Sequence, residues 1–190
     1  MSKTKNKKTG KIRPDWKWIV LIFCLTMLIS AVMSFVSSAI LEDAGLFISF
    51  LILIVIILIG IVFDIIGVAV TAADEVPFHA MASRKVPEAK EALRLLRNAN
   101  KVSSFCNDVI GDICGVISGS ASAVIAVRVI ARHPGTKELV LNLVLSALVA
   151  ALTVGGKACG KSVAIQQSTA VVKMTARVLH FFRRTGKKKD

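Results

Sequence analysis

Four long runs of apolar residues alternate with short polar segments along this chain of 190 residues. A helix crosses a bilayer with about 20 consecutive, mostly apolar residues. The runs near this length cover residues 16–41, 46–71, 104–127 and 139–155. They predict an all-α, polytopic membrane bundle with four transmembrane helices. The first run is too long for a signal peptide, so we count it as an extra N-terminal span.

The polar segments between and after these runs have a helical pattern of another kind. Residues 74–101 predict a helical hairpin, and the second helix of this hairpin alternates apolar with basic positions. Residues 161–184 predict a C-terminal amphipathic helix. Both patterns are typical of helices that lie against a bundle or among lipid headgroups. The basic tails are residues 1–15, expected to be disordered, and residues 185–190.

Basic residues are concentrated on one side of the predicted membrane. The chain is 54% hydrophobic and has a net charge of +13. Lys and Arg precede the first span, fill the hairpin and follow the fourth span, whereas the first loop carries only Glu42 and Asp43. Because basic loops stay in the cytoplasm, both termini are predicted inside, in a multi-pass protein of the cell membrane. The loop with Arg128, Arg132 and Lys137 opposes this orientation, but it has fewer basic residues than the segments predicted to be inside.

Composition and motifs exclude several classes of function. The positive charge lies at membrane borders, so the lipid bilayer is an expected partner and nucleic acid is not. The sequence has no Ser/His/Asp arrangement, phosphate-binding loop or metalloprotease motif, so it does not predict an enzyme. The four cysteines lack zinc-ligand spacing and are expected to act as reduced, apolar residues.

Three carboxylates, Asp64, Asp108 and Asp112, lie inside the predicted spans. A charge in hydrocarbon is costly and usually marks the path of an ion or proton. Asp64 and Asp112 each lie about eight residues from the inner end of their span, or roughly 12 Å deep. Equal depth predicts that they converge, with Asp108 and Asn107 nearer the mouth. Oxygen ligands of this kind suit a divalent cation, first of all Mg²⁺.

A structural role for these carboxylates is equally compatible with the sequence. Lys157 follows the fourth span and is placed to neutralise Asp64 or Asp112. One hypothesis is a cation site that Lys157 tunes, with backbone carbonyls near Gly67 and Gly111 as further ligands. The other is a non-transporting structural or regulatory membrane protein with an internal Asp–Lys pair.

Glycines recur at four-residue intervals in the third span. Gly111, Gly115 and Gly119 share this spacing. Small residues in such a register let helix backbones approach closely, either within one chain or between two chains. The spacing therefore predicts a helix-packing face.

From about Phe63 to Phe182, the order of these features resembles the membrane domain of the CNNM and CorB magnesium and cobalt transporters. The matching segments are FDIIGVAV from Phe63, KVPEAKEALRLLRN ending at Asn98, IGDICGV from Ile110 and GKACGKSVA from Gly156. The resemblance implies three spans, a helical hairpin between the first two, a homodimer and an inward-opening cation site. The sequence shows no CBS domain pair, which is common in that family, and it adds the N-terminal span.

The resemblance also implies that the site has changed. Asp64, Gly67 and Asp112 stand where the family has Ser, Glu and Asn. Lys157 and Gly160 stand where its last span has Glu and Pro. Such changes either rebuild the charge of a cation cavity or replace the bound cation by an internal Asp–Lys pair.

Overall fold

The computed structural model describes residues 16–43, 45–133, 135 and 137–186. Within these residues every regular element is a helix, which confirms the all-α fold. Four helical segments are long and apolar enough to cross a membrane, as the sequence predicts. The predicted tail 1–15 and residues 187–190 of the second tail lie outside the described residues.

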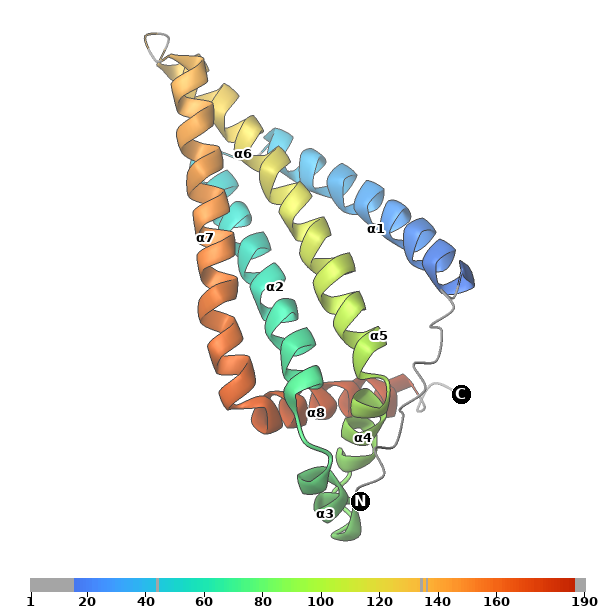
Figure 1. The fold of residues 1–190 in the computed structure, drawn as a ribbon. Coiled ribbons are helices and arrows are strands. Elements are labelled where there is room, and N and C mark those ends of the chain that lie inside the picture. Colours follow the sequence, from blue (N-terminus) through green and yellow to red (C-terminus); the bar gives the residue numbers. More distant parts are fainter. Residues whose placement is uncertain (1–15, 44, 134, 136, 187–190) are drawn as a thin grey trace, which may run out of the picture.

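The candidate spans form a bundle of long helices that run up and down (Figure 1). Their bounds are α1 Trp16–Asp43, α2 Leu46–Ala72, α6 Asp112–Arg132 and α7 Glu138–Gln166. α2 packs against both α6 and α7 around one apolar cluster: Leu53, Ile57, Ala121, Ile125, Ala126, Leu145 and Val149. Large apolar side chains also cover the outward faces of the spans, as contact with lipid requires.

The third candidate span changes helix type along its length. It begins with α5 (Ala99–Ser104), continues as the π-helix η1 (Phe105–Gly111) and ends with α6. The apolar segment as a whole covers Ala99–Arg132, so it extends beyond the predicted 104–127 at both ends. Short π-helical segments are rare and are often found at functional sites.

α1 leans against the bundle rather than completing its core (Figure 1). Its Ile22 and Ile29 pack against the side of the third span that carries Val109, Ile113 and Ile117. The most apolar stretch of α1 contains no buried residue. An apolar helix with so much exposed surface needs lipid around it.

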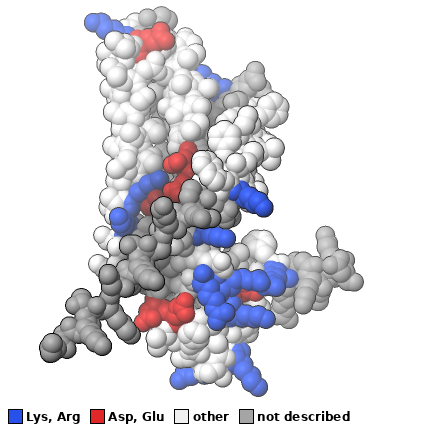
Figure 2. Space-filling model, turned by 45° about the vertical axis from the view of Figure 1, so that its right-hand side comes forward, with Lys and Arg blue, Asp and Glu red and all other residues white. Residues whose placement is uncertain are grey.

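Three shorter helices form a second layer, the base of the bundle. They are α3 (Val76–Ser83), α4 (Ala89–Arg97) and α8 (Ser168–Gly186), which runs across the ends of the spans (Figure 1). A buried cluster joins this layer to α2 and α7: Ala69, Val70, Phe78, Ala92, Leu96, Ala164, Val172 and Ala176. Basic side chains gather on the base (Figure 2). The predicted hairpin 74–101 is therefore a packed part of the fold.

Two helix boundaries near the C-terminus differ from the prediction. The fourth span was expected to end at Gly155, but α7 continues to Gln166. The glycine pair does not end the helix because Gly156 packs tightly against Ile61 of α2. Lys157 consequently lies within a spanning helix, and the C-terminal helix starts at Ser168 rather than at residue 161.

Candidate functional site

An ion pair between two spans is the centre of the candidate site. The Lys157 Nζ of α7 lies 3.5 Å from Asp64 Oδ1 of α2. The two side chains are only 28% and 16% exposed, respectively. Removing a charge from water is costly unless an opposite charge lies beside it. The lysine therefore neutralises the carboxylate inside the bundle.

Glycines in α7 bring Lys157 to this position. A Cβ on Gly160 would lie 2.7 Å from Cγ1 of Ile65, and one on Gly156 would overlap Ile61. With hydrogen at these positions, the backbone of α7 approaches α2 more closely than larger residues allow. Lys157 follows Gly156 directly, so it then reaches Asp64 on α2.

The third span closes the site from another side. The Lys157 Nζ lies 3.3 Å from the point where a Cβ on Gly111 would be. Gly111 is the last residue of the π-helix η1. Because it has no side chain, its backbone faces the ammonium group directly. Lys157 is thus the residue at which α2, η1 and α7 meet.

An unsatisfied oxygen lies one helical turn below Asp64. Asn107 of η1 donates from Nδ2 to Ser103 Oγ at 3.3 Å. Its Oδ1 is buried and has no hydrogen-bond partner among the described residues. The side chain fits only because residue 67 is glycine, since a Cβ on Gly67 would overlap Asn107. Buried acceptors are nearly always satisfied, so this oxygen is free to accept a donor or to bind a cation.

Asp108 and Asp112 are not partners in this ion pair. Both residues are exposed, and neither makes a salt bridge in the part of the chain that the structure describes. In that part, no three His, Cys, Asp or Glu residues are close enough to hold a metal ion. The convergence of Asp64 with Asp112 stays a prediction. Asp64 and Lys157 pair directly. In the same region Asn107 lies against Gly67, and Gly111 lies against Lys157.

The orientation of the third span explains why these two carboxylates are exposed. Cys114 faces Gly60 of α2, where an added Cβ would lie 3.0 Å from Cys114 Cβ. Val109 and Ile113 are buried toward α1. The remaining face carries Asp108 and Asp112. Figure 2 shows acidic and basic side chains next to each other on the flank of the spans.

The glycine stripe of the third span is only partly used within the chain. Gly111 faces Lys157, but a Cβ on Gly115 or Gly119 would meet no atom of the described residues within 4 Å. The predicted packing face is therefore open over these two glycines. Packing within one chain, one of the two options for this stripe, does not occur there.

Sequence reasoning did not find the polar contact at the opposite end of the bundle. Arg128 was assigned to a loop, but α6 continues to Arg132, so Arg128 lies within the helix. Its Nη1 donates to Ser49 Oγ at 3.0 Å, and Ser49 is fully buried in the first turn of α2. The available signal was Ser49, the one polar residue in the apolar run 46–63.

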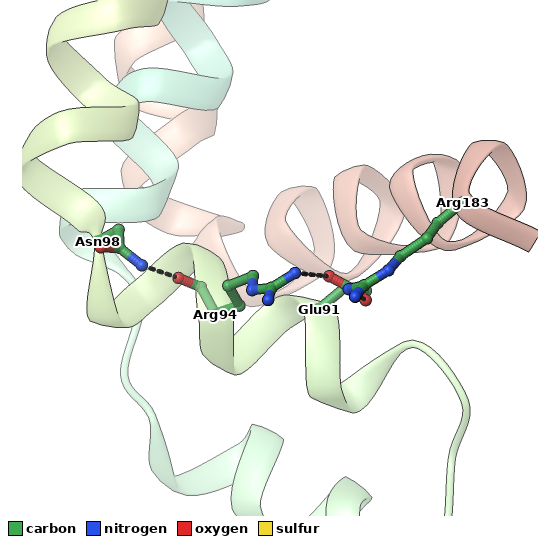
Figure 3. Close-up of polar contacts among 4 residues, drawn as sticks. All are labelled: Glu91, Arg94, Asn98 and Arg183. Carbon is green, nitrogen blue, oxygen red and sulfur yellow. Dashed lines mark hydrogen bonds and ion pairs between the residues drawn. The ribbon is translucent and has the colours of Figure 1, made fainter. Parts of the chain in front are cut away.

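Polar contacts also fix α8 to α4 at the base. Arg183 donates to Glu91 at 2.6 Å, and Arg94 lies 3.7 Å from the same carboxylate (Figure 3). Asn98 Nδ2 donates to the backbone carbonyl of Arg94 at 3.0 Å. A second contact joins Arg177 to Glu88 at 3.3 Å. These pairs hold α8 under the spans.

Comparison with known proteins gives no relative. The sequence matches no family model, and no curated protein or solved structure matches it.

Proposed function

We propose that this chain is a membrane protein that binds and moves a divalent cation, magnesium first, and that Lys157 occupies the cation's place when none is bound. The observation that carries this proposal is the pairing of Lys157 with Asp64 between two spans. Ionisable residues within spans usually line an ion pathway. Here the lysine supplies the positive charge that an incoming ion would otherwise bring.

The chemistry of the site favours exchange between an ammonium group and a hydrated cation. Mg²⁺ binds through one or two carboxylates and keeps several waters. Asp64 offers the carboxylate, and the unsatisfied Oδ1 of Asn107 offers a neutral oxygen one turn away. Lysine has a flexible stem, so its ammonium can leave Asp64 without movement of α7. Asp108 and Asp112, exposed on the flank, raise the local concentration of cations.

The proposed orientation follows from charge. The base carries most of the basic residues, and basic segments stay on the cytoplasmic side. Both termini then lie on the cytoplasmic side of the cell membrane, and the site opens toward the cell interior. The resemblance to the CNNM and CorB magnesium and cobalt transporters supports the same orientation and the same class of ion.

A homodimer is part of this proposal. Gly115 and Gly119 form an open small-residue face on α6, and Asp112 is exposed on the same helix. A second copy packed there would cover the glycines and exclude lipid from the carboxylate. The resemblance also implies a dimer.

The second candidate function is a structural or regulatory membrane protein that transports nothing. The same ion pair favours it, because a neutralised Asp64 needs no other cation. The two candidates differ in whether Asp64 exchanges its partner.

A flux measurement tests the proposed function. The purified chain is reconstituted into liposomes that contain a fluorescent Mg²⁺ indicator, and an inward Mg²⁺ gradient is applied. We expect flux above that of protein-free liposomes, lost in Asp64→Asn. Glu75→Gln removes an exposed carboxylate outside the spans and should leave the flux unchanged. No flux in the wild-type chain would support the structural candidate instead, and full flux in Asp64→Asn would show that Asp64 does not bind the transported ion.

A further inference from the structure

An apolar groove lies in the angle between α2 and α8. Its volume is about 360 Å³, within the range of small-molecule sites. The groove is lined by Val62, Ile65, Ile66, Val171, Met174, Thr175 and Val178. It is separate from the candidate site, because Val62 and Ile66 lie on the opposite side of α2 from Asp64, at about 100° per residue.

The groove continues into the lipid-facing surface of α2. Leu51, Val55, Leu58 and Val62 are each about half exposed and follow one side of this helix. This side leads directly down to Ile66 and the groove. A hydrocarbon chain that lies along α2 therefore reaches the groove without crossing a polar residue.

α8 supplies apolar contact and positive charge at the same level. Met174 is 70% exposed and Phe182 is 66% exposed. The helix contains no acidic residue. Its Arg177 and Arg183 pair with Glu88 and Glu91, whereas Lys173 forms no salt bridge among the described residues. An amphipathic helix with this composition lies in the headgroup region and attracts anionic lipid.

We infer that the groove holds an acyl chain of an anionic phospholipid from the leaflet on the side of the base, with the headgroup beside Lys173 of α8. The apolar lining accepts the chain, and the charge of Lys173 selects the headgroup. A second copy of this protein is a poorer occupant, because it would bring another strongly basic base to the same place.

Tryptophan quenching by brominated lipids tests this inference. The natural tryptophans are first removed as Trp16→Phe and Trp18→Phe. Met174→Trp then reports on the groove, and Val154→Trp reports on an exposed position of α7 outside it. Each variant is reconstituted in brominated phosphatidylcholine mixed with brominated or plain phosphatidylglycerol, and the relative affinity of the two lipids is derived from the quenching.

At Met174→Trp we expect the anionic lipid to bind about fivefold more tightly than phosphatidylcholine, the preference that one basic residue near a membrane gives. At Val154→Trp we expect no preference. Adding Lys173→Gln should reduce the preference at the groove. Equal affinity at both reporters would overturn the inference. Weak quenching by both lipids at Met174→Trp alone would also overturn it, because protein would then cover the groove.

Discussion

Two ion pairs in this molecule share their chemistry but not their surroundings. Asp64–Lys157 joins α2 to α7 between the spans at 3.5 Å. Glu91–Arg183 joins α4 to α8 at the base at 2.6 Å, and the arginine side chain is 52% exposed. If Arg183 is lost, Glu91 keeps Arg94 at 3.7 Å as a second partner, whereas Asp64 has no second ion-pair partner among the described residues. The longer ion pair is therefore the one whose loss should matter more.

The largest effect is expected when Lys157 is replaced by methionine. Asp64 would keep its charge in an apolar region without a partner, which should reduce the free energy of unfolding by about 3 kcal/mol. Denaturant unfolding in detergent micelles measures this loss. The double variant Asp64→Asn/Lys157→Met is the control, and most of the stability should return because no unpaired charge remains. If Lys157→Met alone were as stable as the wild type, the expected difference in stability between the two ion pairs would be contradicted.

A smaller loss is expected from Gly67→Ala. The added methyl group overlaps Asn107 and must displace it, at a cost of about 2 kcal/mol. Gly155→Ala is the matched control, because its methyl group would meet no atom of the described residues within 4 Å. Its stability should stay the same or rise by up to about 1 kcal/mol, since alanine favours a helix. Equal effects of the two substitutions in the same unfolding assay would show that Asn107 does not lie against Gly67.

At the base, Glu91→Gln should have a moderate effect. Glutamine keeps a hydrogen-bond acceptor for Arg183 but loses the charge, so about 1 kcal/mol of stability should be lost. The loss should be local, with faster protease cleavage in α8 while the spans stay protected. A loss as large as that of Lys157→Met would contradict the distinction between the two surroundings.

The smallest effect concerns Glu88 and its pH dependence. Hydrogen bonding to its own backbone N–H and the nearby Arg177 guanidinium hold the pKa of Glu88 below its ordinary value of 4.5. A lowered pKa in the folded state stabilises the protein above pH 4.5, and this contribution is lost as the pH falls through the folded pKa. Glu88→Gln should therefore be slightly less stable than wild type at neutral pH, and the difference should vanish once the pH falls below the lowered pKa of Glu88. Melting temperatures across this range measure the difference, which should not grow on acidification.

The sequence was sufficient for the spans but not for the geometry of the site. Depth along a helix follows from residue number and rise, so the place of Asp64 within a span was predictable. The direction of a side chain about the helix axis depends on which faces pack. Asp112 is exposed because the buried faces of its helix carry Ile113 and Cys114, the second of which packs against Gly60. The extension of α7 past Gly156 also depends on a contact with a distant helix, and so does the pairing of Lys157 with Asp64.

Magnesium binding to the purified wild-type chain and to Lys157→Met, measured by calorimetry in detergent, tests the central claim most directly. If the ammonium group of Lys157 occupies the cation's place, its removal should increase the affinity for Mg²⁺ by about tenfold or more, because the competing partner of Asp64 is gone. The gain should disappear in Asp64→Asn/Lys157→Met. Equal affinities of the wild type and Lys157→Met, or binding that persists without Asp64, would contradict the account.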